Sequence, residues 1–446
     1  MNVTSALADF VVETCFNDLS EEVIEHTKIC ILDWLGAALA GSLEPPARIV
    51  TSIIKEMKGK RESTIIGVDF KTSCLNASLV NGVFGHAVEL DDIHREAIIH
   101  PGASVIPAAL AIAERANVSG RDFITSIVLG YEVEIRIGMA INPSHYQFWH
   151  TTGTCGTFGA TVAAGKILDL TSEEMVHALG IAGTQAAGLI EVFGTMSKTL
   201  NAGKAAFNGS LAALLAKKGF TSSRNILEAE KGYCRAVANK YDLDKITKNL
   251  GEKFKIMKNI FKIHASCGHT HGAIDAALLM RDKYNIKPDN INRIVIETYP
   301  IAVEVVGNSY EPKTAFEAKF SLPYCLAAAL VYGKVGLTEF SQEKLKDPRV
   351  RKLSKKVRVV IDPKYTNARL GCAKVTLYTL NEKFTCDVDV PRGYPENPVK
   401  REELERKFEN LALYVFPKDR VKKIVDVVNS LETLYGIKVL TELLHK

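Results

Sequence analysis

A segment near residue 90 carries side chains that could transfer protons. It gathers three imidazoles and three carboxylates at the end of an apolar helical run, and it stops at Pro101-Gly102. A carboxylate beside an imidazole can orient the ring and raise its pKa, which suits general acid–base catalysis. The alternatives are a solvated, capped helix end and a metal site, although the spacing matches neither H-E-x-x-H nor an EF-hand loop. The six side chains belong to His86, Glu89, Asp91, Asp92, His94 and His100.

Two later segments offer cationic side chains for a substrate carboxylate. His150 stands just before a predicted helix start, where exposed backbone N–H groups suit an anion. The alternative is that Thr151 or Thr152 caps this helix while His150 packs on Trp149. Lys198 lies between glycine-containing helical segments, where a lysine can hold a carboxylate as a point charge or, if desolvated, act as a base. Most lysines are simply solvated, and the spacing leaves both interpretations open.

A third group of candidates lies farther along the chain. Cys267, His269 and His271 fall within five residues and could bind zinc, but no fourth ligand accompanies them. The alternative is a hinge that lines a cleft between two domains, where sites tend to form. Tyr324 is either a core residue with a satisfied hydroxyl or a proton donor.

The composition excludes several classes of protein. The 446 residues are 47% hydrophobic and 24% charged, which predicts a folded, soluble chain. The net charge of +5 comes with one basic run, Lys352–Arg358, which we interpret as a solvated turn before a strand, so nucleic acid is not an expected partner. Nine scattered cysteines without a C-x-x-C pair predict reduced thiols and a cytoplasmic location. We expect neither a signal peptide nor a membrane span.

The glycines between residues 153 and 165 do not form a nucleotide site. Gly153, Gly156 and Gly159 give G-x-x-G-x-x-G rather than the dinucleotide fingerprint, and Ile167 stands where a phosphate loop needs Ser or Thr. Close packing of helices is a sufficient explanation for them.

The elements that must position these residues are mainly helical. Helical periodicity runs to about residue 258 and returns beyond 399, and an apparently helical stretch spans Phe316–Tyr332. We therefore predict a mainly α fold, with a large all-helical domain built from both chain ends (1–262 and 399–446) and a smaller inserted α+β domain (263–398). Its predicted strands are Arg293–Thr298, Val357–Ile361, Lys374–Leu380 and Lys383–Val390, with a hairpin turn at Asn381-Glu382.

Six motifs follow one another along the chain. They are Asn81-Gly82…His86…Asp91-Asp92…His100-Pro101, Gly130-Tyr131-Glu132, His150-x-Thr152-Gly153, Lys198-x-Leu200-x-x-Gly203, Ser266-Cys267-x-x-Thr270-His271 and Phe320-Ser321-Leu322-x-Tyr324. Each motif is modest by itself, but the ordered set resembles the MmgE/PrpD family along nearly the whole chain. That family includes 2-methylcitrate dehydratases, cis-aconitate decarboxylases and iminodisuccinate epimerases.

The resemblance implies a helical domain with a smaller lid domain, a homodimer, and a site in the cleft between the domains that needs no cofactor or metal. It implies that His150 and Lys198 hold carboxylates, His100 moves a proton next to a carboxylate, Asp92 orients its neighbours and Tyr324 donates a proton. The implied catalytic residues are His100, Asp92, His150, Lys198 and Tyr324, and the implied substrate-binding residues are Asp91, His94, Thr152, Cys267 and His271.

Departures from the family pattern concern the choice of substrate. The dehydratases tend to have His-Pro-Ser-Asp-Asn where this chain has His100-Pro101-Gly102-Ala103-Ser104. Ile93 stands where many members have Thr, and Asn201 replaces a histidine that is common in the family. Cys267 stands where some decarboxylases have His. We expect these changes to alter which carboxylate is accepted while leaving the proton-transfer residues in place.

Three functions fit these residues. The first is a lyase that dehydrates or decarboxylates a small di- or tricarboxylate of the citrate or aconitate kind. The second is an epimerase of an imino- or amino-dicarboxylate, which would use the same residues without releasing water or carbon dioxide. The third is a catalytically silent protein that only binds a carboxylate.

Overall fold

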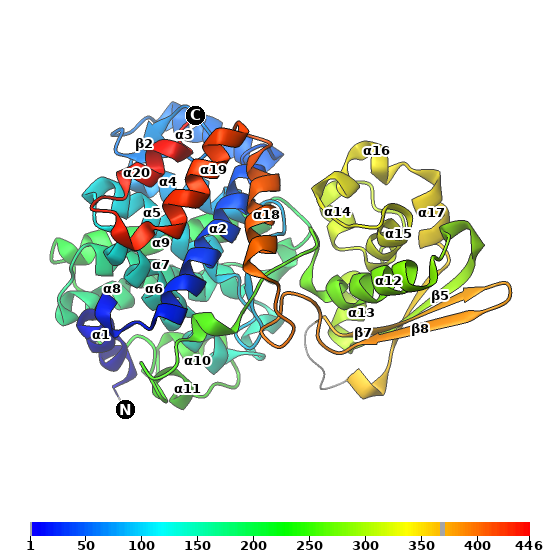
Figure 1. The fold of residues 1–446 in the computed structure, drawn as a ribbon. Coiled ribbons are helices and arrows are strands. Elements are labelled where there is room, and N and C mark those ends of the chain that lie inside the picture. The colour runs from blue at the N-terminus through cyan, green and yellow to red at the C-terminus, as the bar shows by residue number, and fades with distance from the viewer. Residues whose placement is uncertain (1, 366–370) are drawn as a thin grey trace. The chain divides into compact units, whose positions relative to one another are not determined.

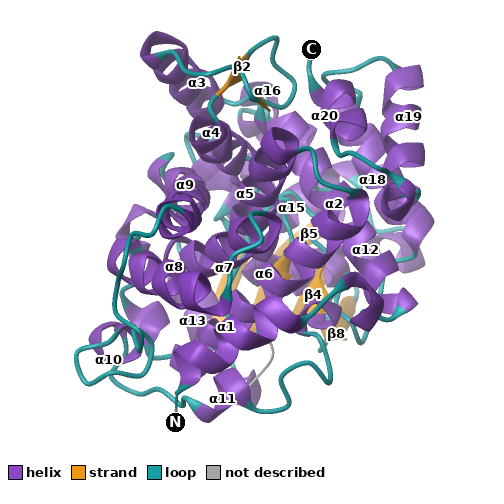
Figure 2. Ribbon diagram, turned by 90° about the vertical axis from the view of Figure 1, so that its left-hand side faces the viewer, coloured by secondary structure: helices purple, strands orange, loops and turns teal. Residues whose placement is uncertain are grey.

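The computed structural model describes residues 2–365 and 371–446, and these are mainly α-helical (Figures 1 and 2), as predicted. By its internal contacts the chain divides into two compact units. The first unit comprises Met1–Ala87, Asp91–Ile260 and Lys400–Lys446, and the second comprises Val88–Leu90 and Phe261–Val399. Within the described ranges, no helix is both long enough and apolar enough to cross a membrane. None of the nine cysteines, all of which lie in the described ranges, forms a disulfide.

The first unit consists of packed helices from both ends of the chain. Its α2 and α18 lie side by side although they are far apart in sequence (Figure 1), and Lys407 on α18 pairs with the buried Asp33 on α2 at 2.6 Å. Its helices are α1 (Val3–Glu13), α2 (Glu21–Gly41), α3 (Pro45–Met57), α4 (Cys74–His86), α5 (Pro101–Ala116), α6 (Gly120–Ile141), α7 (Thr151–Ile167), α8 (Ser172–Gln185), α9 (Ser197–Lys217), α10 (Tyr233–Val237), α11 (Asp244–Thr247), α18 (Arg401–Ala412), α19 (Lys418–Asn429) and α20 (Lys438–Leu444). Its short strands are β1 (Ser63–Thr64), β2 (Lys71–Thr72), β3 (Ile93–His94) and β4 (Asn259–Ile260).

Small residues let the helices around the candidate site approach closely. A Cβ on Gly82 of α4 would lie 2.8 Å from the Cα of Gly203 on α9, and a Cβ on Gly203 would lie 2.5 Å from the carbonyl oxygen of Leu79. A Cβ on Gly156 of α7 would meet the Ser104 hydroxyl at 2.5 Å. The contact at Gly156 confirms close helix packing as the reason for this glycine, and Gly82 and Gly203 add a second close crossing. The α4–α9 crossing matters most, because α4 ends at His86 and α9 begins beside Lys198.

The second unit contains a four-stranded sheet with the order β6-β5-β7-β8. Strand β5 (Ile291–Thr298) pairs in parallel with β6 (Val357–Ile361) and antiparallel with β7 (Ala373–Thr379), which forms a hairpin with β8 (Lys383–Val388). The four predicted strands and the hairpin turn are therefore confirmed, with bounds that agree to within two residues. The helices of this unit are α12 (His271–Tyr284), α13 (Pro300–Val306), α14 (Ala315–Lys319), α15 (Leu322–Tyr332), α16 (Gln342–Leu345) and α17 (Pro348–Ser354).

The stretch Phe316–Tyr332 is helical as predicted, but it consists of two helices, α14 and α15, which meet at Phe320 and Ser321. Ser321 is extended and caps α15, since its hydroxyl accepts a hydrogen bond from the Tyr324 N–H at 3.1 Å. Pro323 lies in the first turn of α15, where its missing N–H costs nothing. The apolar period alone did not reveal this break, because both helices bury apolar side chains.

The glycine contact between α4 and α9 gives a stability prediction. Gly203→Ala should destabilise the protein by about 1–3 kcal/mol, because the new methyl group meets backbone atoms that must move. Urea unfolding of wild type and variant measures the difference. Gly336→Ala is the control, since a Cβ there approaches only the Glu339 side chain at 3.3 Å. Equal unfolding midpoints for wild type and Gly203→Ala would contradict the prediction.

Candidate active site

The buried carboxylate of Asp91 joins two imidazoles at the end of α4. Its Oδ2 lies 2.7 Å from Nδ1 of His86, the last residue of α4, and 3.1 Å from Nδ1 of His100, which precedes α5. The two rings meet edge to face, with centroids 4.7 Å apart. Burial alone would raise the pKa of Asp91, but the two imidazoles hold it well below its usual value. Asp91 is therefore an anion that is hydrogen bonded to His86 and lies within ion-pair distance of His100.

Two imidazoles and a carboxylate are also donor types that transition metals use. The candidate ligand atoms of His86, Asp91 and His100 lie within 4.8 Å of one another. However, the two nitrogen–oxygen distances of 2.7 and 3.1 Å are hydrogen-bond lengths. They are shorter than the separation of about 3.3 Å between ligands of a tetrahedral zinc ion with bonds near 2.0 Å. The His86–Asp91 distance is therefore that of a hydrogen-bonded pair rather than of two ligands on one metal ion.

Asp92, the next residue, makes different contacts. Its Oδ1 accepts a hydrogen bond from the Gly102 N–H at 3.0 Å, in the first turn of α5. Its Oδ2 accepts from the Tyr131 hydroxyl of α6 at 2.9 Å and from the side-chain amide of Asn259 on β4. Burial and the nearby Asp33 and Asp91 charges raise the pKa of Asp92 to about 7. These contacts make Asp92 a residue that orients the start of α5, next to His100.

His150 lies beside His86, at the start of α7. The two rings are stacked with centroids 5.5 Å apart, and the other side of His150 meets the Phe193 ring edge on at 5.0 Å. Its Nδ1 lies 3.2 Å from the side-chain amide nitrogen of Asn201 on α9. Because an amide N–H donates, Nδ1 accepts and the proton of a neutral ring sits on Nε2. His150 is thereby prepared to donate a hydrogen bond through Nε2.

The predicted alternative of a threonine cap for the helix after His150 is wrong. Trp149 stacks on His145. Neither threonine caps α7, because the N-cap residue is His150 itself and it makes no side-chain cap. The Thr152 hydroxyl instead accepts a hydrogen bond from the His100 N–H at 3.1 Å, which ties the two histidine segments together.

Lys198 reaches the same neighbourhood from the first turn of α9. Lys198 is only 5% exposed, and its Nζ lies 5.4 Å from the centroid of the Phe193 ring. His150 contacts the same ring. A nearly buried ammonium on an aromatic face is a strong electrostatic group for an anion. The alternative of a merely solvated lysine does not describe this side chain.

The His94 ring is buried and uncharged. Burial, together with the positive charges of Lys255, Arg95 and Lys258, lowers its pKa to about 3. Its Nδ1 accepts a hydrogen bond from the Ala97 N–H at 3.3 Å, so it holds the 94–97 turn. The predicted substrate-binding role of His94 would have to use the uncharged ring.

The candidates in the second unit have several partners within that unit. The Tyr324 hydroxyl is buried and donates to the Glu339 carbonyl oxygen at 2.6 Å, as a satisfied core tyrosine does. His271 Nε2 lies 3.3 Å from the Ser266 carbonyl oxygen, and the half-buried Cys267 begins a 3-10 turn (Gly268–Thr270). Within the residues that the structure describes, Cys267 is not part of a metal-ligand group.

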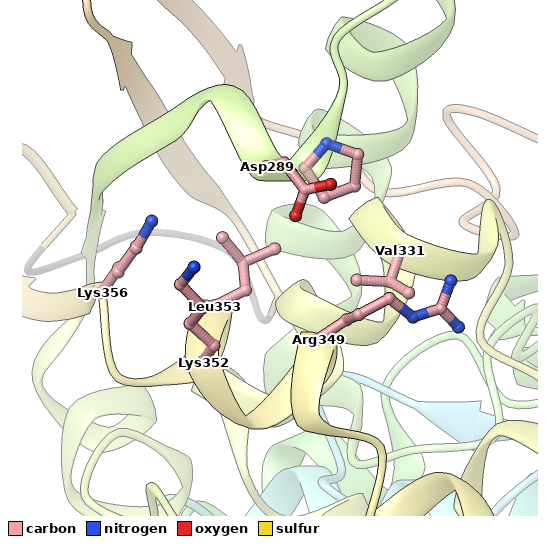
Figure 3. Close-up of a pocket in the computed structure, with 7 residues that line it drawn as sticks. Asp289, Val331, Arg349, Lys352, Leu353 and Lys356 are labelled. Carbon is pink, nitrogen blue, oxygen red and sulfur yellow. The ribbon is translucent and has the colours of Figure 1, made fainter.

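One pocket of the second unit contains none of the candidate residues. Figure 3 shows Arg349, Lys352 and Lys356 around it together with Asp289. Lys356 Nζ donates to the Ile291 carbonyl oxygen at 2.5 Å, and Arg349 is bonded to the Asp347 carboxylate at 2.7 Å. Part of this basic surface is therefore already neutralised or hydrogen bonded within the protein. The run Lys352–Arg358 spans the end of α17 and the start of β6, as the interpretation of a turn before a strand predicts.

Sequence reasoning did not assign several residues that the site contains. His86 was singled out with its segment but received no role, and Asn201 was noted only as a replacement for histidine. Phe193 and Asn259 carried no sequence signal, because each acts through contacts with residues far away in the chain. Tyr131 lies in a family motif, which is the signal that could have identified it.

Comparison with known proteins shows which family the chain resembles. The profile of the MmgE/PrpD N-terminal domain matches residues 5–246, and that of the MmgE/PrpD C-terminal domain matches residues 264–433. A cis-aconitate decarboxylase of Aspergillus terreus is 30% identical, over 99% of this chain and 96% of its own. The human cis-aconitate decarboxylase is 29% identical over 99% and 94%. A mitochondrial 2-methylcitrate dehydratase of Yarrowia lipolytica is 24% identical over 96% and 88%.

The raised pKa of Asp92 predicts a specific pH dependence of stability. A carboxyl group whose folded-state pKa lies above its unfolded value binds its proton more tightly when folded, so stability falls as the pH rises from about 4 to about 7. Asp92→Asn removes this titration but keeps an acceptor for the Gly102 N–H. The free energy of unfolding of wild type, relative to that of the variant, should fall by at most about 4 kcal/mol between about pH 4 and pH 8. Urea unfolding at each pH measures it. Parallel pH profiles of wild type and variant would contradict the raised pKa.

Proposed function

Because the chain belongs to the MmgE/PrpD family, we propose that it is a cofactor-independent lyase acting on a small di- or tricarboxylate of the citrate or aconitate kind. The observation that carries the proposal is the buried Asp91 anion shared by His86 and His100. Relatives named as decarboxylases and dehydratases support a lyase, whereas the epimerase alternative gains nothing from them. The decarboxylases are the more similar of these relatives, so an aconitate-like tricarboxylate is the first substrate to test.

His100 moves the proton in the proposed reaction. Asp91 faces its Nδ1, which leaves Nε2 to exchange a proton with the carbon next to a substrate carboxylate. In a decarboxylation the bond between carbon and the departing carboxylate breaks, carbon dioxide leaves, and a proton from the site bonds to the carbanion. In a dehydration the base takes a proton from carbon, and the hydroxyl group leaves as water after receiving a proton.

Lys198 and His150 hold the carboxylates that do not react. Lys198 supplies a positive charge, and His150 supplies an N–H donor on the nitrogen opposite Asn201. Both are nearly buried, and charge–charge interactions strengthen where water is excluded. A dianion or trianion of the citrate kind provides the negative charges that such a site requires.

The remaining assignments follow from the resemblance. Cys267 and His271 would bind the substrate, and Tyr324 would donate a proton after exchanging its hydrogen bond to Glu339 for one to the substrate. The second unit would act as a lid, and the protein would be a cytoplasmic homodimer. Light scattering during size-exclusion chromatography tests the dimer.

Proton NMR in D₂O tests the reaction itself. Purified protein is incubated with cis-aconitate, citrate, 2-methylcitrate, malate and aspartate-derived dicarboxylates, with and without EDTA. A product lighter by carbon dioxide or water, formed equally in both series, supports the proposal. Unchanged mass with inverted handedness would replace it with the epimerase. No product and no deuterium exchange, from a protein that still binds carboxylates in calorimetry, would favour the binding-only alternative.

Replacing His100 provides the sharpest test of its role. His100→Asn should lower kcat by about 10²–10⁴-fold, because it removes the acid–base group while keeping polar contacts. A steady-state assay with the substrate found above measures the effect. The matched control is His177→Asn on α8, where the ring pairs with the exposed Glu173 at 3.2 Å. Near-normal turnover by His100→Asn would remove the assignment.

A further inference from the structure

His86 is a buried imidazole to which the proposed reaction gives no chemical step. It closes α4 and is fully buried. Its Nδ1 contacts Asp91, and its ring lies between those of His100 and His150. Its Nε2 has no hydrogen-bond partner among the described residues. The polar contact of His86 is therefore made by Nδ1 alone.

Two rings share one oxygen of Asp91, and they do so unequally. His86 makes the shorter contact at 2.7 Å, whereas Nδ1 of His100 lies 3.1 Å from the same Oδ2. Because the carboxylate is ionised, the nitrogen of His86 that faces it carries a hydrogen and donates it. This hydrogen bond holds the carboxylate in place and takes up part of the negative charge that His100 would otherwise feel.

We propose that His86 is a positioning residue, which holds the Asp91 carboxylate through Nδ1 and so orients His100. The same contact limits how strongly Asp91 stabilises the charged form of His100. The inference rests on the proposed function, because it assigns His86 to the same proton-transfer site. It goes beyond that proposal by naming a third histidine and a function carried by only one of its two nitrogens.

Other ionisable groups also surround these rings. Asp92 follows Asp91 in the chain, and Asp33 on α2 acts on Asp92. His150 on the α7 side stacks on His86, and Lys198 on α9 shares Phe193 with His150. None of these groups is itself replaced in the His86 variants, and comparison of His86→Asn with His86→Gln, which both remove the ring that His150 stacks on, isolates the His86–Asp91 contact.

Substitutions at His86 separate the two nitrogens. His86→Asn places an amide N–H near the position of Nδ1 and should keep the bond to Asp91. In His86→Gln the longer side chain places its amide near Nε2, and in His86→Leu no donor remains. All three variants are checked for folding by circular dichroism and thermal unfolding.

The first readout is histidine NMR titration of His100 in the protein without substrate. His86→Asn should leave the pKa of His100 near the wild-type value. His86→Leu and His86→Gln should raise it by roughly one unit, because an opposite charge that is no longer shared favours the protonated ring. If Leu does not fold, the Gln variant alone decides. An unchanged titration in Gln or Leu, or equal shifts in all three, would overturn the inference.

The second readout is the pH profile of kcat/KM. In His86→Gln, the limb of the profile that reports protonation of His100 should move to higher pH by roughly one unit. In His86→Asn this limb should lie at the wild-type pH. A general loss of activity without this shift would indicate a merely structural role and overturn the inference. Absence of turnover in wild type would contradict the proposed function, while the NMR titration would still decide the role of His86.

Discussion

Two consecutive carboxylates, Asp91 and Asp92, are buried in the loop after α4, and the site depends on how each is satisfied. A buried carboxylate without hydrogen bonds or a positive partner costs several kcal/mol, so the loop must take a shape that brings partners to both. Asp91 meets two imidazoles. Asp92 meets the first turn of α5 and side chains from α6 and β4. These contacts connect the loop to the surrounding helices and place His100 at the start of α5.

The two carboxylates have equal burial but opposite pKa shifts. Imidazole partners keep Asp91 ionised, whereas Asp92 faces the like charges of Asp33 and Asp91 and has a pKa of about 7. Such divergence is typical of sites that run acid–base chemistry near neutral pH. Here the two carboxylates have different partners: Asp91 contacts the rings of His86 and His100, and Asp92 supports the backbone next to His100.

Much of the fold could be predicted from periodicity. The four strands of the second unit and the mainly helical character agree with the structure, because alternation and helical repeats report which face of an element is buried. The break between α14 and α15 was missed, since Ser321 interrupts the backbone without interrupting the apolar pattern. The environment of His150 was also missed: its neighbours His86 and Phe193 are distant in sequence, whereas the adjacent Trp149 stacks elsewhere.

The sequence by itself determined the helical class, the order of the motifs, the family resemblance and the residue types available for proton transfer. Only the tertiary structure decided which of these side chains meet. Adjacent residues such as Asp91 and Asp92 point to different partners, and Asn259 reaches Asp92 across 167 positions of the chain. The physical reason is that a pattern along the chain reports burial, whereas hydrogen bonds and charge pairs form between atoms that the packing of several helices brings together.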